Sequence, residues 1–324
     1  MNVQKKAESN VLTSSHTLQV QAGDICCMLR CDDEETMARL REIYGNFLTD
    51  QYADIVLELK TINKVSINMF EELLPKMKVS HEATKDGDLF ETPDLTANGA
   101  CDLNTGKVTL NVEKHLLDSD AGRGYVNHGL CLVYHTACKL KHNGHPPALI
   151  VHSCAVIRNN RVFLFAGPSG IGKTTVARMC GDKYGQVLND EGVLLSRPGQ
   201  DNNTLMVKGI PIIGELPYRL NTTVPLGAIF LLKQAEKTSA RRLSQMEAYT
   251  RFMRQVARPI YMAKQERREV YALIAEFSEE VSRTTPFFEL EFTLDQESLW
   301  EVVGEVEKSL DKEGRNNEKT DIQD

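Results

Sequence analysis

The sequence predicts an α/β domain that binds a phosphate group, preceded by a smaller α+β domain. Two observations carry this prediction. The segment from 161 to 178 has the pattern of a β-strand, a glycine-rich loop with a lysine, and a helix, which is the order that a phosphate-binding loop requires. Strand-like and helix-like segments then alternate through the rest of the chain, as they do in a sheet covered by helices. The 324 residues leave room for two modest domains or one large one.

Composition and charge exclude several classes of partner. With 45 acidic and 38 basic residues the net charge is −7, which gives nucleic acid no general attraction. An apolar content of 41% is typical of a globular protein, and no apolar run reaches the ~18 residues needed to cross a bilayer. The N-terminal residues lack the apolar core of a secretory signal. We therefore expect a cytoplasmic protein with reduced cysteines and without nucleic-acid or membrane partners, and we leave homo-oligomerisation open.

Four parts are expected along the chain. Residues 1–18 and 308–324 are polar and rich in charge, so each is expected to be a disordered tail. Residues 19–121 are expected to form the α+β N-terminal domain. Residues 122–307 are expected to form the phosphate-binding domain together with a leading helix.

The N-terminal domain is predicted from strand and helix patterns. Apolar and polar residues alternate in the strand-like segments, and an acidic first turn opens the helix-like one. The predicted strands are 17–29, 53–60 and 107–112, and the predicted helix is 32–48. No chemical motif occurs in this part, so its expected role is to shape a cleft or hold a partner.

The leading helix, residues 122–142, carries a stripe of histidines and cysteines opposite its apolar face. The stripe consists of His128, Cys131, His135, Cys138 and His142. Neighbouring members could chelate a soft metal, because side chains three or four residues apart meet on a helix. The whole stripe spans about 21 Å at ~1.5 Å per residue, which is too long for one ion. We therefore expect a packed structural helix without a metal.

The phosphate-binding domain is predicted to alternate strands and helices. The predicted strands are 148–157, 161–167, 186–195, 224–232 and 287–293, and the predicted helices are 174–185, 248–259 and 297–310. A turn at Asn159 and Asn160 is expected to join the first two strands into a hairpin. The glycine-rich loop follows the second strand and precedes the first helix.

The loop fits the pattern G-x-x-x-x-G-K-[ST] at every defined position. The residues expected to contact the nucleotide are Gly167, Pro168, Ser169, Gly170, Ile171, Gly172, Lys173, Thr174 and Thr175. Glycines let successive backbone N–H groups point at a phosphate, and the following helix adds the positive end of its dipole. Lys173 can reach the β- and γ-phosphates, and the Thr174 hydroxyl can ligate Mg²⁺. The sequence therefore predicts binding of ATP with Mg²⁺, whereas a mere connecting turn would leave Lys173 without a role.

Transfer of a phosphoryl group also needs an acid near the metal and a group that takes the proton of the attacking oxygen. Asp190 and Glu191 stand side by side in a strand-like segment, and their apolar flanks indicate burial rather than a solvated turn. Adjacent strand residues point to opposite faces unless a bend brings both to one cleft. With such a bend, one acid could hold Mg²⁺ and the other could accept the proton.

Residues 151–195 resemble the C-terminal catalytic domain of the HPr kinase/phosphorylase family, and more closely the HPr-kinase-related proteins of bacterial peptide-modification cassettes. The resemblance extends from Leu149 through the rest of the domain. It implies a PEP-carboxykinase-like P-loop fold and Mg·ATP-dependent phosphorylation of a hydroxyl, which in the HPr kinases is that of a protein serine. The site residues that the resemblance implies are Asp190 as base, His152 as its polarising neighbour, Lys173 at the phosphates, and Thr174 with Glu191 at the metal.

The sequence departs from the family pattern at two places. Thr174 and Thr175 stand where the HPr kinases carry Ser-Glu, and the signature Glu-Ile-Arg-Gly-Leu-Gly is absent. The nearest stretch, residues 209–219, offers Glu215 as a metal ligand and Arg219 as a phosphate contact. The expected acceptor is a serine or threonine hydroxyl of a peptide or protein. A small-molecule kinase and an ATP-binding regulatory module with little turnover are the alternatives.

Arg251, Arg254 and Arg258 share one face of the predicted helix 248–259. A guanidinium on this face could stabilise the charge of a transferring phosphoryl group. A solvated basic face is the simpler interpretation, and it is the one that we expect.

Overall fold

The contacts of the computed structural model divide the chain into two compact units. One unit consists of Met1–Gly144 with Ile260–Lys264, and the other of His145–Pro259 with Gln265–Asp324. The structure describes residues 15–62, 80–84, 87–91, 98–102, 107–113, 127, 130, 131, 134, 148–197, 204–256 and 264–320. The domain boundary expected at 121/122 lies outside these residues, so it stays a prediction.

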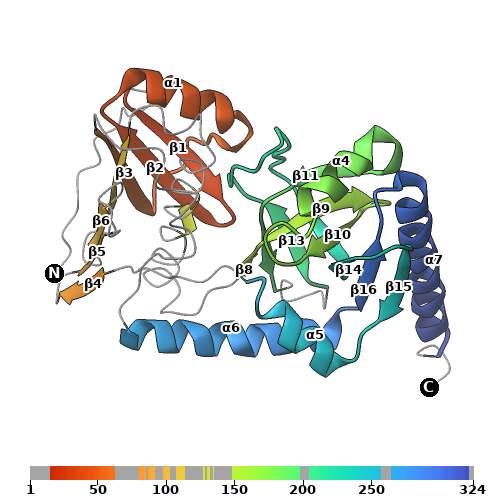
Figure 1. Ribbon diagram of the computed structural model, residues 1–324. Helices are drawn as coiled ribbons and strands as arrows, with labels where there is room; N and C mark the ends of the chain where they lie inside the picture. Colours follow the sequence, from red (N-terminus) through yellow and green to blue (C-terminus); the bar gives the residue numbers. More distant parts are fainter. Residues whose placement is uncertain are drawn as a thin grey trace. The chain divides into compact units, whose positions relative to one another are not determined.

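The N-terminal unit is built on one mixed sheet. Its strands follow the order β1-β2-β3-β7-β6-β5-β4, with β2, β3 and β7 parallel to one another (Figure 1). The strand bounds are β1 Thr17–Ala22, β2 Ile25–Cys31, β3 Ile55–Ile62, β4 Ser80–Thr84, β5 Gly87–Glu91, β6 Asn98–Asp102 and β7 Lys107–Glu113. Gly23 takes a φ of 67° between β1 and β2, so the segment predicted as one strand is a hairpin. β3 and β7 confirm the two other predicted strands.

Helix α1 (Glu34–Ile43) packs on β1 and β2 and confirms the helix predicted in this unit. It begins after Asp33, whose side chain accepts a hydrogen bond from the backbone N–H of Thr36 at 2.8 Å. Met37 and Leu40 are buried and turn the apolar face of the helix toward the sheet.

Little of the predicted leading helix falls within the described residues. The residues that the structure describes there are 127, 130, 131 and 134, and all are helical. The members of the histidine and cysteine stripe that lie outside the described residues are His128, His135, Cys138 and His142. The expectation of a helix without a metal therefore stays a prediction.

The C-terminal unit is built on a larger sheet. Its strands follow the order β11-β9-β10-β14-β13-β12-β8, and β16 pairs with β14 and β15 (Figure 1). The bounds are β8 Ala148–Val151, β9 Ser153–Arg158, β10 Arg161–Ala166, β11 Gln186–Asn189, β12 Val193–Ser196, β13 Met206–Gly209, β14 Thr223–Gln234, β15 Ser239–Arg242 and β16 Phe287–Phe292. Asn159 and Asn160, with φ of 46° and 60°, turn β9 back on β10 as predicted. β10, β14 and β16 run parallel, so their carboxyl ends share one edge.

Two segments predicted as continuous strands are broken. The chain passes from β8 to β9 at His152, and from β11 to β12 between Asn189 and Val193. The registers place Val193 opposite Val151 and Asn189 opposite Ala155. The two breaks therefore lie side by side, at the same position along the direction of the strands.

The second break has its cause in the buried side chain of Asn189. Its Oδ1 accepts hydrogen bonds from the backbone N–H groups of Glu191 at 2.7 Å and Gly192 at 3.0 Å. Its Nδ2 donates to Ile212 O at 2.9 Å. These bonds replace strand pairing with a turn, as asparagine side chains commonly do. The turn takes Asp190 and Glu191 out of the strand ladder.

Helices cover both faces of the C-terminal sheet. α4 (Lys173–Tyr184) and α7 (Gln296–Thr320) share one core with the aromatic rings of β10, β14 and β16. α5 (Gln245–Phe252) and α6 (Lys264–Thr284) join the core on the other face. α4 and α7 confirm predicted helices, and α5 confirms the predicted helix 248–259 only as far as Phe252. The additions to the predicted elements of this unit are α6, β13 and β15. Within the described residues, every helix is too short or too polar to cross a bilayer.

Trp300, the only tryptophan of the chain, ties α7 to α4. Its Nε1 donates to Met179 O at 2.7 Å in the buried interior. α4 is kinked near this carbonyl at Gly181, whose φ of 50° is non-helical. A kink interrupts regular helical hydrogen bonding, and the indole N–H gives the carbonyl a donor. Tyr184 stacks on the indole with ring centroids 5.7 Å apart, so the C-terminal end of α4 is fixed.

α7 replaces most of the tail expected at 308–324. Leu310 is buried, and Asp311 Oδ1 accepts a hydrogen bond from Arg161 Nη2 at 2.6 Å. Leu310 follows Val306 at helical spacing, so the apolar stripe of the helix extends into the segment expected to be a tail. The expectation of disorder is therefore wrong where the helix continues.

A buried carboxylate of α7 binds the hairpin between β9 and β10. Glu307 is 4% exposed, and it accepts hydrogen bonds from Arg158 Nε at 3.2 Å and Asn159 Nδ2 at 2.8 Å. Arg158 also donates to Tyr184 O at 2.7 Å and lies over the ring of Trp300. One carboxylate therefore connects the hairpin, α7 and the end of α4.

We expect Glu307→Ala to lower the free energy of unfolding by about 3 kcal/mol, because it leaves the partly buried Arg158 guanidinium without its carboxylate. Glu305→Ala, on the exposed side of the same helix, is the matched control and should change it by less than about 0.5 kcal/mol. Urea unfolding followed by far-UV circular dichroism measures both variants. Equal effects would contradict the role given to Glu307.

Candidate functional site

The glycine-rich loop connects β10 to α4 at the carboxyl edge of the sheet. Gly170 and Gly172 have φ of 77° and 117°, a region that glycine adopts without strain. A Cβ on Gly172 would also lie 2.7 Å from Phe292 Cζ, so the loop and β16 approach each other only because this position has no side chain. Gly172 caps α4 without a side-chain acceptor, which leaves the first N–H groups of the helix available to a ligand.

Lys173 is buried and folded back across the loop. It is 6% exposed, and its Nζ donates to Gly167 O at 3.0 Å and Pro168 O at 3.2 Å. Burial lowers the pKa of Lys173, and the nearby carboxylates of Glu191 and Glu215 oppose that shift. The cation therefore lies in a partly dry site, where its attraction for a phosphate is stronger than in water.

His152 lies beside the start of the loop, because the residue that follows it pairs with the last residue of β10. Its Nδ1 is 2.8 Å from Glu191 O and 3.2 Å from Glu191 Oε1. Its backbone N–H donates to Gln255 O at 2.8 Å. His152 thus contacts Glu191 rather than Asp190, the neighbour that the family resemblance implies.

Asp190 is 1% exposed and is held by the segment that crosses over it. Its Oδ2 accepts hydrogen bonds from the backbone N–H groups of Glu215 at 3.2 Å and Leu216 at 3.3 Å. In the described part of the chain its Oδ1 has no hydrogen-bond partner. A Cβ on Gly214 would lie 1.9 Å from Oδ1, so only glycine allows this approach. Burial raises the pKa of Asp190, the N–H donors oppose the shift, and the nearby Glu191 adds to it.

Glu215, expected as a metal ligand, forms an ion pair. Its Oε2 lies 3.0 Å from Arg178 Nη2, and both side chains are more than half exposed. Arg219, expected at the phosphates, forms a backbone bridge with Asn189. Thr174 stands in the first turn of α4. Five of the predicted residues are connected at the loop by hydrogen bonds, ion pairs or electrostatic interactions. They are His152, Lys173, Asp190, Glu191 and Glu215.

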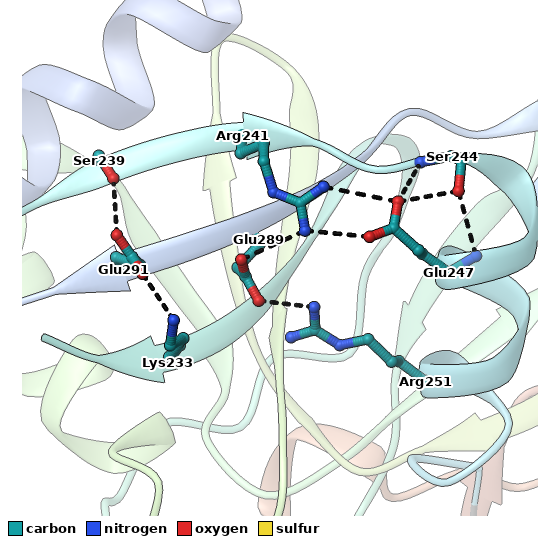
Figure 2. A network of polar contacts seen from close by, with 8 residues as sticks. All are labelled: Lys233, Ser239, Arg241, Ser244, Glu247, Arg251, Glu289 and Glu291. Atoms are coloured by element: carbon teal, nitrogen blue, oxygen red, sulfur yellow. Dashed lines mark hydrogen bonds and ion pairs between the residues drawn. The ribbon is translucent and has the colours of Figure 1, made fainter.

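Arg251 belongs to a polar network over β15 and β16 (Figure 2). Its Nη1 donates a hydrogen bond to Glu289 Oε2 at 2.7 Å. Arg241 Nη2 donates to Glu289 Oε1 at 3.3 Å and to Glu247 Oε1 at 3.1 Å, so it links the two carboxylates. Arg251 is therefore held in an ion pair and only partly solvated, rather than directed at a phosphate. Arg258 lies outside the described residues. This network was not predictable from the sequence, because Glu289 is far from Arg251 along the chain.

We expect Asp190→Asn to raise the midpoint of thermal unfolding by roughly 2–4 °C at pH 7. Because burial raises the folded-state pKa of Asp190, its contribution to stability is present below the unfolded-state pKa and is lost as the pH rises through the folded-state pKa. The amide keeps an oxygen for the two N–H donors and removes the buried charge.

Differential scanning fluorimetry in EDTA measures this shift, with Asp182→Asn at an exposed position of α4 as the control. The gain from Asp190→Asn should shrink as the pH is lowered. A lower midpoint for this variant at pH 7 would mean that the buried carboxylate stabilises the fold.

Comparisons with known proteins place the chain in a family. No curated protein matches the sequence. The HPr(Ser) kinase/phosphatase from Coxiella burnetii overlaps 50% of this chain and 98% of its own, with 13% identity and a TM-score of 0.30. The family model described as SynChlorMet cassette protein ScmC matches residues 126–308, which is more than half of the chain, and it agrees with the expectation of a cassette protein. The chain therefore belongs to the SynChlorMet cassette protein ScmC family.

Proposed function

We propose that the chain is a Mg·ATP-dependent kinase that transfers the γ-phosphoryl group to a hydroxyl of a peptide or protein. The observation that carries this proposal is the buried Lys173, folded across a glycine loop at the uncapped N-terminus of α4 and close to carboxylates. Burying a cation costs free energy unless a partner compensates it, and a connecting turn gives no reason for that cost. A phosphate on the same loop would supply the compensating charge.

The loop residues fit the phosphates of a nucleotide. The N–H groups at the start of α4 have no side-chain acceptor, and the helix dipole adds positive potential there. Lys173 would leave the carbonyls of Gly167 and Pro168 to bind the β- and γ-phosphates. Bound Mg·ATP supplies the electrophilic phosphorus, and the loop binds the phosphates and neutralises their charge.

Thr174 and Asp190 are the residues that would hold Mg²⁺. Within the described residues no three His, Cys, Asp or Glu side chains gather as a ready-made metal site. Mg²⁺ commonly takes only one or two carboxylates and completes its shell with phosphates and water. Asp190 fits because its Oδ1 is buried and lacks a hydrogen-bond partner in that part of the chain. Glu191 and Glu215 fit less well, because each already lies against a basic side chain.

The acceptor is proposed to be a serine or threonine hydroxyl of a polypeptide encoded in the same cassette, phosphorylated in the cytoplasm. The description of the family as cassette proteins supports an acceptor of this kind.

We expect Lys173→Ala to weaken the binding of Mg·ATP by about 10²-fold, because it removes the charge-assisted hydrogen bonds to the phosphates. Lys183→Ala, at the exposed end of the same helix, should leave the affinity unchanged. Isothermal titration calorimetry measures both variants. Equal affinities for the two variants and the wild type would mean that the loop is a connector.

Transfer itself is tested by single-turnover reactions with [γ-³²P]ATP and the polypeptides of the cassette. Asp190→Asn should lower the rate by about 10²-fold and leave ATP binding within a few-fold, because it loses a charged metal ligand but no phosphate contact. ATP binding without transfer to any polypeptide or metabolite would instead make the chain a regulatory nucleotide-binding module.

A further inference from the structure

A phosphoryl transfer to a hydroxyl needs a group that takes the proton of the hydroxyl. We propose that His152 is this general base, through its Nε2, and that Glu191 is the positioning residue that orients it. The inference rests on the proposed function. It departs from Asp190, the base that the family resemblance implies.

Asp190 is poorly placed to take a proton from a substrate. It is 1% exposed, and its Oδ2 already accepts two backbone N–H groups. Its Oδ1 lies against Gly214, so closely that a Cβ there would be 1.9 Å away. A base must come within about 2.6–3.2 Å of the group that it deprotonates. A hydroxyl on a peptide can reach Asp190 only if the peptide backbone also fits beside it. A metal ion is much smaller and needs less space there.

The hydrogen bonds of His152 fix the tautomer that a base requires. Glu191 O is a carbonyl oxygen and can only accept, so the Nδ1 that lies 2.8 Å from it carries the proton. The carboxylate Oε1 of Glu191, 3.2 Å from Nδ1, is a second acceptor for the same N–H. The neutral imidazole then has its lone pair on Nε2, which has no hydrogen-bond partner within the described residues. A carboxylate behind the imidazole also stabilises the imidazolium that forms.

The position of His152 suits an attack on a phosphate held by the loop. The pairing of β9 with β10 places it beside Gly167, where the loop begins. Its side chain is 34% exposed, so an acceptor can reach it from solvent. Glu191 is held by the bend at Asn189, and its carboxylate acts electrostatically on Lys173. The pair and the phosphate-binding lysine therefore belong to one site.

In the step, the acceptor oxygen forms a bond to the γ-phosphorus as its proton passes to His152 Nε2. The bond from the γ-phosphorus to the bridging oxygen breaks, and its electron pair leaves with ADP. The imidazolium then releases the proton to solvent on its exposed side. The sum is conversion of ATP and an alcohol to ADP, a phosphate ester and a proton.

The test is single-turnover hydrolysis of [γ-³²P]ATP with water as the acceptor, at saturating Mg·ATP. His152→Ala should lower the rate by about 10²–10³-fold, keep ATP affinity within about twofold, and recover part of the rate when imidazole is added. Rescue by imidazole requires a missing base, and a merely structural role would not respond to it. His16→Ala is the matched control, because His16 Nδ1 also lies against a backbone carbonyl, Cys31 O at 3.1 Å, in the other unit.

Two outcomes would overturn the inference. One is a rate for His152→Ala within about threefold of wild type. The other is a low rate for His152→Ala that added imidazole does not raise. Failure of the wild type to bind ATP would instead overturn the proposed function.

The tautomer is measured independently of turnover. Two-bond ¹⁵N–¹H correlation spectra, with the His152 signal assigned by its loss in His152→Ala, should show that the neutral ring carries its proton on Nδ1 and none on Nε2. A protonated Nε2 in the neutral ring would overturn the inference even if the wild type hydrolysed no ATP.

Discussion

The buried side chain of Asn189 is the constraint on which the site depends. Along a regular strand Asp190 and Glu191 would point to opposite faces of the sheet. Asn189 prevents this, because its Oδ1 takes the N–H groups of the next residues and its Nδ2 ties the turn to Ile212 O. Both ends of the amide are satisfied, so the bend is specified and not merely tolerated. Aspartate could accept the same two N–H groups but could not donate to Ile212.

The consequence is a division of the two acids between different environments. Asp190 turns inward, where backbone N–H groups hold one oxygen and the other is buried. Glu191 turns toward His152 and stays partly exposed. Neighbouring carboxylates that differ this much in burial are suited to different tasks, one at a fixed cation and one in proton transfer.

The helix that carries Lys173 is held at both ends by groups that do not take part in the chemistry. At its start, Gly172 lies against the Phe292 ring. At its end, Trp300 and Arg158 hold the carbonyl oxygens of Met179 and Tyr184. A lysine placed on such an element keeps its position when a ligand enters. The exposed pair of Arg178 and Glu215 contributes little by comparison, because water and salt screen it.

Features that depend on close neighbours in the chain were predictable, and features that depend on distant partners were not. The glycine-rich loop between β10 and α4, the hairpin turn at Asn159 and helix α1 all follow from residues that are close together in the sequence. The break at Asn189 was hidden, because apolar residues on both sides continue the strand pattern. The pairing of His152 with Glu191 and of Arg158 with Glu307 joins residues that only the sheet topology brings together. α6 escaped prediction because its many charged residues hide the buried Ile274, Phe277 and Val281.

The single indole of the chain gives the protein a built-in optical reporter. Trp300 is 2% exposed, stacked on Tyr184 and hydrogen-bonded to the main chain of α4. No second indole contributes to its emission, since the sequence contains only this one. Indole fluorescence is sensitive to hydration and to neighbouring charge, and here the ring also lies under the Arg158 guanidinium. Its emission therefore records, without any label, whether the C-terminal end of α4 stays packed when a ligand is added at the glycine-rich loop.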